Sequence, residues 1–385
     1  MAILLVSGIL LTIAKTQSAA VVVIGVISYF TPLPAVLMGY RFARKPWRID
    51  RFIGGYVAAV CVMASGVYLY MLGYDNVLLV PVTEWLDVYG PHGTVHLLPG
   101  FFRTAENAAW HGSSAICLLI VRQAMRHQRA SSQWLAATVA SYLTGAVLLT
   151  GRRKAVVEIG VFFVLYGILA FLQRRGSRRV LSIGLASVLG SALFVKLGYF
   201  DALTGSGAIA YVERGQSVVA EISDRVDVTL RSYKQVIAAN GVFGAGVGMG
   251  SQGAQHFGAG MVAVGGAAES GPAKVLAELG VPGICVAAWL LFSAGRLMWR
   301  KLTVLRRSRA RSFIAANGLV CFLAANGAVF LVNHQIFGDP FVLLMLGWIT
   351  GFILALVREA EPLVEVEVPG AAERSALPPL QAVGA

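Results

Sequence analysis

The sequence predicts an all-α integral membrane protein, a bundle of helices that crosses the bilayer about ten times. Of its 385 residues, 57% are hydrophobic and only 13% are charged, whereas a soluble domain carries roughly 25% charged residues. The apolar residues form long runs, and Lys and Arg form short clusters between these runs. We expect one transmembrane domain over residues 1–357 and a disordered, cytoplasmic, acidic tail over residues 358–385.

The long apolar runs mark ten candidate membrane spans, since one crossing takes about 20 residues. They cover residues 2–14, 19–40, 52–72, 108–121, 134–150, 155–172, 180–197, 273–292, 313–332 and 341–357. The first run is short for a full crossing. Pro32 and Pro34 are expected to kink the second span, because proline cannot donate the helical hydrogen bond.

Basic clusters predict which side of the membrane each loop occupies. Cytoplasmic loops are enriched in Lys and Arg, and such clusters occur at residues 41–51, 122–129, 173–179 and 296–311. Both termini are then cytoplasmic, and residues 199–272 form one long extracytoplasmic loop. Residues 210–239 of this loop predict an amphipathic helix, which either lies on the bilayer surface or contributes to a site. Its apolar side chains are Ile222, Val226, Leu230, Tyr233 and Ile237.

Three adjacent cations break this orientation rule. Arg152, Arg153 and Lys154 fall on the outer side, between the fifth and sixth predicted spans. A misplaced helix boundary or side chains reaching to lipid headgroups would explain them. We favour an anion site at the outer membrane surface, because the planar guanidinium group suits phosphate oxygens.

Other polar residues gather on the same side. Arg103, Glu106, Trp110 and His111 lie within nine positions at the mouth of the fourth span and indicate a polar pocket. Trp110 also suits a membrane-interface anchor. In the turn between the last two spans, His334 and Asp339 either cap a helix or, in the case of His334, contribute to substrate binding.

The densest glycine segment runs from Asn240 to Gly283 and passes through Glu269 into an apolar helix. Glycine lets a backbone lie close to a ligand, but flexible linkers have the same composition. The segment is not a P-loop, because the Gly-Lys-Ser/Thr ending is absent. Lys274 and Glu278, one turn apart on the following helix, are expected to pair.

The composition disfavours several function classes. The net charge of +13 lies in clusters between spans, which is the pattern of a membrane protein and not of a nucleic-acid-binding face. The four cysteines fall inside apolar segments without paired spacing, so we expect neither a disulfide framework nor a zinc site. No other metal and no cofactor is expected.

Four segments in the same order resemble the O-antigen polymerase and ligase family of bacterial envelope glycosyltransferases. These are GFFRTAENAAWHG at 100–112, LTGRRKA at 149–155, GVFGAGVG at 241–248 and KVLAELGVPG at 274–283. The last is similar to the family's L-x-E-x-G-x-x-G helix start and is the most specific. The resemblance covers about residues 99–291.

The resemblance implies an α-helical, metal-independent enzyme at the periplasmic face of the bacterial inner membrane. Such enzymes transfer a glycan from undecaprenyl pyrophosphate to an acceptor hydroxyl. Two arginines hold the pyrophosphate, and they correspond here to Arg152 or Arg153 and to Arg225, with Arg231 as a rival. The ligases have a histidine base where this chain has Glu269, a difference that disfavours a ligase.

The hypothesis from the sequence is therefore an inverting polysaccharide polymerase. Arg153 and Arg225 stabilise the leaving pyrophosphate, and Glu269 is the base with His111 as its rival. Substrate-binding roles are assigned to Arg152, Lys154, Arg103, Glu106, Trp110, Arg231 and His334. The partners are a membrane lipid carrier with its oligosaccharide, a chain-length regulator and a flippase. The alternatives are a ligase to lipid A core and, in another class, a lipid-linked oligosaccharide flippase or transporter.

Overall fold

The computed structural model describes residues 2–16, 18–74, 76, 78–79, 87–90, 93–126, 130–172, 222–251, 270–308 and 310–358. The predicted span 180–197, residues 210–221 of the predicted amphipathic helix, Glu269 and tail residues 359–385 lie outside this range. The predicted spans within it are helical, and the second of them, residues 19–40, falls on two helices. The helical membrane protein expected from the composition is confirmed at this level.

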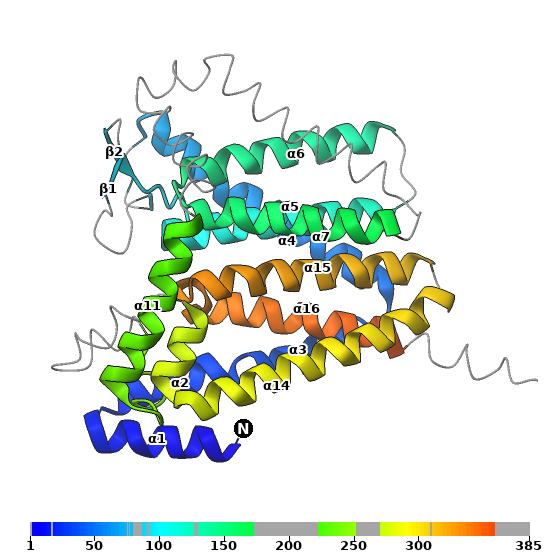
Figure 1. Cartoon of the computed structure of the whole chain (residues 1–385). Coiled ribbons are helices and arrows are strands. Elements are labelled where there is room, and N and C mark those ends of the chain that lie inside the picture. Colours follow the sequence, from blue (N-terminus) through cyan, green and yellow to red (C-terminus); the bar gives the residue numbers. More distant parts are fainter. Residues whose placement is uncertain are drawn as a thin grey trace, which may run out of the picture.

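The elements follow one another along the chain as shown in Figure 1. They are α1 (Ala2–Thr16), α2 (Ala19–Phe30), α3 (Pro32–Phe42), α4 (Pro46–Met71), β1 (Asp87–Gly90), β2 (Gly93–His96), α5 (Ala105–Met125), α6 (Ala130–Leu149), α7 (Arg153–Leu172), α11 (Ile222–Asn240), α14 (Gly271–Ser308), α15 (Ala310–Val332), the 3-10 helix η1 (Gln335–Gly338) and α16 (Pro340–Arg358). The strands β1 and β2 form a short antiparallel hairpin in the loop before α5.

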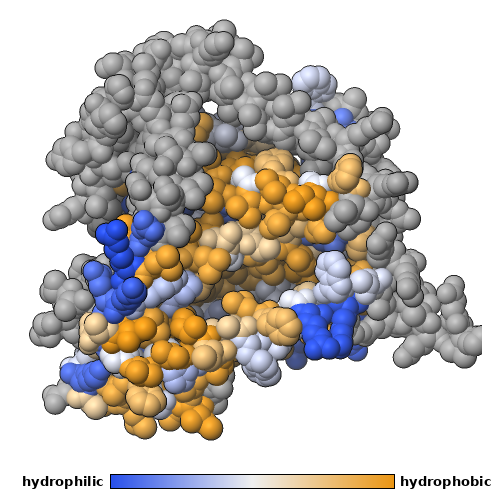
Figure 2. All heavy atoms as spheres, viewed as in Figure 1, coloured by the Kyte–Doolittle hydropathy of each residue, from blue (hydrophilic) through white to orange (hydrophobic). Residues whose placement is uncertain are grey.

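Six of the described helical segments are long and apolar enough to cross a membrane. They are Ala19–Phe42, Trp47–Met71, Ser132–Leu149, Gly271–Arg300, Ser312–Val332 and Pro340–Arg358. The visible face of the described helices is largely apolar, and hydrophilic side chains gather near its two ends (Figure 2). Large side chains such as Phe292 and Trp299 are well exposed among the described residues. A bilayer accommodates such a surface, whereas water does not.

Proline shapes the second predicted span as expected. The helix is interrupted at Thr31, and Pro32 begins α3. Proline is tolerated at a first helical position, because the N–H it lacks has no helical partner there. Pro46 begins α4 in the same way, so residues predicted to form a basic loop are helical. The basic segment 296–308 likewise continues α14 to Ser308, since Arg and Lys are good helix formers.

The centre of one group of helices is α5. It packs against α4, α6, α7 and α15, and its residues from Ala108 to Val121 are almost all buried. Its first half carries His111, Ser113 and Ser114, which lowers its hydropathy. These polar groups face other helices, so a helix that is not among the six candidate membrane spans is nevertheless buried inside the bundle.

The helix α11 lies across the ends of α15 and α16 and runs transverse to them (Figure 1). Val236 and Ser232 are buried among its described side chains, and Val236 packs against Ala273, Leu276 and Ala277 of α14. The predicted apolar face is therefore only partly covered, because Leu230 and Ile237 remain exposed. The exposed half of that face suits a bilayer surface.

The two ends of the bundle differ in their ion pairs. At one end, which we call the basic end, Asp50 on α4 pairs with Arg122 at 3.2 Å and with Arg126, both on or next to α5. Arg358 at the end of α16 donates to the Tyr40 hydroxyl there. At the other end lie the first turns of α5, α7 and α16, and we call this the pocket end.

Candidate functional site

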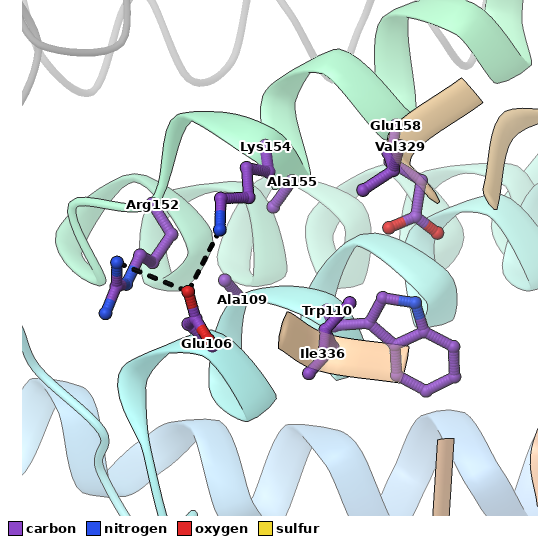
Figure 3. Close-up of a pocket in the computed structure, with 9 residues that line it drawn as sticks. All are labelled: Glu106, Ala109, Trp110, Arg152, Lys154, Ala155, Glu158, Val329 and Ile336. Carbon is purple, nitrogen blue, oxygen red and sulfur yellow. Dashed lines mark hydrogen bonds and ion pairs between the residues drawn. The ribbon is translucent and has the colours of Figure 1, made fainter. Parts of the chain in front are cut away.

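A small pocket opens at the pocket end between α5, α7, α15 and η1. Its lining residues are Glu106, Ala109, Trp110, Arg152, Lys154, Ala155, Glu158, Val329 and Ile336 (Figure 3). It encloses about 20 Å³, which is room for about one water molecule. A sugar does not fit inside, so a large substrate has to bind at the mouth.

Charged side chains form the rim of this pocket. The Glu106 carboxylate accepts a hydrogen bond from Lys154 Nζ at 3.0 Å and pairs with Arg152 Nη1 at 3.3 Å (Figure 3). We call Glu106, Arg152 and Lys154 the charged rim. Burial raises the pKa of the Glu106 carboxyl, but the charges of Lys154 and Arg152 outweigh burial and hold this pKa below its usual range.

Local sequence explains why the rim residues meet. Thr104 caps α5 by accepting from the backbone N–H of Asn107 at 3.2 Å, which places Glu106 in the first helical turn. Gly151 ends α6 with a φ of 67°, a left-handed conformation that only glycine adopts easily. The chain then turns at once into α7, so Arg152 and Lys154 face the start of α5.

A buried polar network forms the floor of the pocket. Glu158 on α7 is 1% exposed. Its carboxylate accepts from Ser113 Oγ at 2.6 Å, from Ser114 Oγ at 3.2 Å and from Asn326 Nδ2 at 3.1 Å. Trp110 Nε1 donates to Asn326 Oδ1 at 2.6 Å and so holds the amide in place. We call Glu158, Ser113, Ser114 and Asn326 the floor network.

The structure places Trp110 and His111 inside the bundle. Trp110 is 3% exposed and lines the pocket, so its interpretation as a membrane-interface anchor is wrong. His111 Nδ1 lies 2.8 Å from the Tyr56 hydroxyl, and its ring stacks on Phe102. His111 is not among the residues that line the pocket.

Other predicted site residues lie at different distances from the pocket. Arg153 begins α7 beside the rim and is partly buried. His334 is buried before η1, and its charge acts on Glu106, although its side chain caps no helix. Asp339 does cap α16, by accepting from Phe341 N at 2.8 Å, as predicted. Arg103 is exposed in the turn before α5.

The predicted second arginine lies on a helix that packs mainly on another part of the bundle. Arg231 is exposed on α11, and the main packing partner of α11 among the described helices is α14. Arg225 belongs to the backbone of the same helix, and its side chain lies outside the described part. The predicted base Glu269 also lies outside the described residues. Of the reaction centre expected from the resemblance, the structure therefore describes Arg152 and Arg153 but not the side chain of Arg225 or Glu269.

The glycine-rich loop packs against helices in its described part, residues 241–251. Val247 is fully buried, and its N–H donates to Gly8 O on α1 at 3.2 Å. Thr12 on α1 donates to Val247 O at 2.8 Å. A methyl group at Gly248, where φ is 89°, would overlap the backbone of α2. The expectation that this loop lies against a ligand is therefore not met in these residues, which serve helix packing.

A break in α14 exposes the backbone carbonyls to which the same loop binds. Gly280 has a φ of 66°, and Pro282 has no N–H, so the carbonyls of Ala277 and Glu278 lose their helical partners. The N–H groups of Ala245 and Gly246 replace those partners, at 2.6 and 3.1 Å. The loop is thus paired to the broken turn by its backbone.

Glu278 reinforces this docking with its side chain. It is fully buried, and its Oε1 accepts from Gly250 N at 3.2 Å. Lys274 Nζ lies 4.0 Å from the same oxygen, which confirms the predicted pair. The Tyr29 hydroxyl neighbours this carboxylate without meeting hydrogen-bond geometry. We call Lys274 and Glu278 the loop clamp.

Sequence reasoning missed Glu158 as a site residue. It lies four positions after Lys154, which suggests an ordinary helical ion pair near a helix end. Instead Lys154 turns to Glu106, and the floor network comes from two other helices. The sequence does indicate Glu158 in one way, because it is a glutamate inside a run of apolar residues. Placing an ionisable residue inside a membrane helix costs free energy, and such residues are often functional.

The chain matches no protein-family model and no curated protein. The function is therefore argued from the chemistry of the pocket.

Proposed function

We propose that the protein is a polysaccharide polymerase that transfers oligosaccharide repeat units from undecaprenyl pyrophosphate onto a sugar hydroxyl. The reaction is an inverting, metal-independent displacement at the periplasmic face of a bacterial inner membrane. The charged rim binds the pyrophosphate at the mouth of the pocket, and the lipid chain stays in the bilayer. The order of motifs along the chain supports the same proposal.

The observation that carries the proposal is a buried guanidinium donor at the rim. The Glu106 carboxylate pairs with Arg152 and Lys154. Arg152 Nε is buried and has no hydrogen-bond partner among the described residues. A phosphate oxygen at the mouth would satisfy this donor, since guanidinium groups suit phosphate geometry.

Fixed cations match the electrostatics of glycosyl transfer. When the bond between the sugar and the pyrophosphate breaks, negative charge develops on the leaving oxygen. Cations held in place by the fold stabilise that charge without having to reorganise, and such stabilisation supplies much of the rate enhancement of many enzymes. A rim at the membrane surface also suits a substrate with a polar head and a lipid tail.

A flippase or transporter of the same lipid is the second candidate. Buried Glu158 favours it, because ionisable groups inside a membrane bundle often lie on ion paths. Transporters also place broken helices at their substrate sites, and α14 is broken at Gly280. In this chain, however, loop N–H groups already occupy the free carbonyls of that break, which leaves the polymerase as the better proposal.

The test is turnover by purified full-length protein in detergent, with EDTA present. Lipid-linked oligosaccharides extracted from the native host cells serve as donor and acceptor. Wild type should release undecaprenyl pyrophosphate and lengthen the glycan, whereas Arg152→Ala should lose about 10²–10³-fold in kcat/KM. Arg296→Ala, an exposed arginine on α14 outside the rim, is the matched control and should keep wild-type turnover.

Three other results would overturn the proposal. Turnover that is equal in wild type and Arg152→Ala would remove the rim from the mechanism. Transfer only to a lipid A core acceptor would identify a ligase. Passage of the lipid across liposomes without any transfer would identify the flippase.

A further inference from the structure

We infer that Glu158 accepts the proton of the acceptor hydroxyl in the proposed transfer. This inference rests on the proposed function and deepens it by naming a base that the sequence motifs do not indicate. It is drawn from the floor network, the charged rim and the pocket that joins them.

Glu106 and His111 are poorly placed for this role. Glu106 is held between Lys154 and Arg152, and its lowered pKa makes it a weak proton acceptor. His111 is occupied by the Tyr56 hydroxyl at Nδ1 and does not line the pocket. Lys154 is paired with Glu106 as a cation of the rim. Among the described lining residues, Glu158 is therefore the remaining carboxyl group.

Glu158 combines burial with neutral partners. Its three donors are two serine hydroxyls on α5 and the Asn326 amide on α15. Among the described residues it forms no ion pair within 4.0 Å. Its charge acts on Tyr56 on α4 and Cys117 on α5, and Lys154 lines the same pocket. Burial opposes the negative charge and the three hydrogen bonds support it. The carboxylate is therefore suited to exchanging a proton and not to serving as a fixed charge.

One lone-pair position of the carboxylate is left for the pocket. An ionised carboxylate offers about four such positions, and three are taken by the floor network. The pocket has room for about one water molecule between Glu158 and the rim. A water bound there would link a hydroxyl at the mouth to the carboxylate, because proton transfer through one water is within the reach of a general base.

The proton and the electrons balance in this step. The acceptor oxygen forms a bond to the anomeric carbon while the bond from that carbon to the pyrophosphate oxygen breaks. The electron pair of the broken bond leaves with the pyrophosphate, which the charged rim stabilises. The hydroxyl proton passes through the water to Glu158, and it returns to solvent after the product leaves.

The experiment compares wild type, Glu158→Gln and Asp50→Asn as full-length proteins with the native lipid-linked oligosaccharide extract. Loss of a general base costs about 10²-fold or more in kcat, so Glu158→Gln should show this loss while KM for the donor stays close to wild type. Wild-type turnover should fall on acidification as Glu158 takes up a proton. The residual turnover of Glu158→Gln should not change over the same pH range. Binding of inorganic pyrophosphate should be unchanged, and Asp50→Asn should behave as wild type.

An infrared difference spectrum guards against a variant that fails to fold. Acidification of wild type and of Glu158→Asp should produce a protonated carboxyl band over the pH range in which turnover falls. The absence of this band in wild type would overturn the inference whatever the fate of Glu158→Gln.

The two proposals fail in distinguishable ways. Turnover by wild type together with equal turnover and an equal acid fall in Glu158→Gln would overturn the role of Glu158 and leave the polymerase standing. Absence of any transfer by wild type from the native extract would overturn the polymerase, and the role of Glu158 with it.

Discussion

Two buried glutamates, Glu158 and Glu278, sit in different parts of the bundle and have different partners. Glu158 is 1% exposed, lines the pocket and accepts from neutral donors only. Glu278 is fully buried too, but it lies 4.0 Å from Lys274 and holds a backbone N–H of the glycine-rich loop. The comparison teaches that burial alone does not identify a reacting carboxylate. The neighbouring charges decide whether it reacts or holds the fold together.

The strongest test of this contrast removes the cation of the loop clamp. Lys274→Met leaves Glu278 buried without its partner, and an uncompensated buried charge costs about 3–5 kcal/mol. We expect a large drop in the unfolding midpoint in detergent. The double variant with Glu278→Leu should recover part of the loss, because it removes the stranded charge. A single variant as stable as wild type would contradict a structural role for the clamp.

Glycine substitutions in the glycine-rich loop should lower the free energy of unfolding by less than Lys274→Met does. A methyl group at Gly248 overlaps the carbonyl of Val21 and meets a φ of 89°, so Gly248→Ala should destabilise the fold by about 1–3 kcal/mol. Turnover per folded molecule should remain near wild type, because the described loop residues hold helices and not substrate. Gly55→Ala, on α4 with open space around the new methyl, is the control and should be neutral. Lost turnover with an unchanged unfolding midpoint would move the loop into the site.

The charged rim should show a pH signature. The pKa of Glu106 is lowered in the folded protein, so its contribution to stability is present above its unfolded value near ~4.3. That contribution disappears as the pH falls through the lowered value. Glu106→Gln should therefore lower the free energy of unfolding by about 1 kcal/mol at neutral pH. It should leave this free energy unchanged at a pH below the lowered pKa of Glu106.

The same variant also tests the rim as an anion site. Removal of the carboxylate removes an anion that competes with a ligand for Arg152, so inorganic pyrophosphate should bind several-fold more tightly at neutral pH. Calorimetry of purified wild type and Glu106→Gln measures this difference. Weaker binding in the variant would mean that Glu106 organises the cations for the ligand and does not compete with it.

The smallest effect is expected at the basic end. Asp50 pairs with Arg122 and Arg126, whose side chains are 24% and 40% exposed. Partly exposed pairs contribute about 0–1 kcal/mol and are screened by salt. Asp50→Asn should lower the unfolding midpoint slightly at low salt and not at high salt. If Asp50→Asn lowered the unfolding midpoint as much as Lys274→Met, the proposed difference in stability between buried and exposed ion pairs would be wrong.

Several features of the fold followed from the sequence. The interruption at Thr31 follows from Pro32, and the cap of α16 follows from Asp339. The helices follow from apolar runs, because a backbone in lipid has to satisfy its own hydrogen bonds. The hairpin β1–β2 was not foreseen, since its two short strands carry no long alternating pattern.

The candidate site was predictable only in part. Glu106, Trp110, Arg152 and Lys154 were singled out by their place on the outer side, and the structure brings all four to one pocket. His111 was drawn into the aromatic packing around Tyr56 and Phe102 instead. Arg231 was placed on a helix that packs elsewhere. Position along the chain indicates which end of the bundle a residue occupies, but not the direction in which its side chain points.

The sequence by itself determined a helical membrane protein with one polar end and one basic end, because hydropathy and charge act on each segment separately. Only the tertiary structure decided that Glu158 faces Asn326, 168 positions away, and not Lys154, one turn away. It also decided that the glycines near 248 pack against α1 and α2. Both outcomes depend on how helices fit side by side, and close packing of side chains leaves no trace in the periodicity of any one helix.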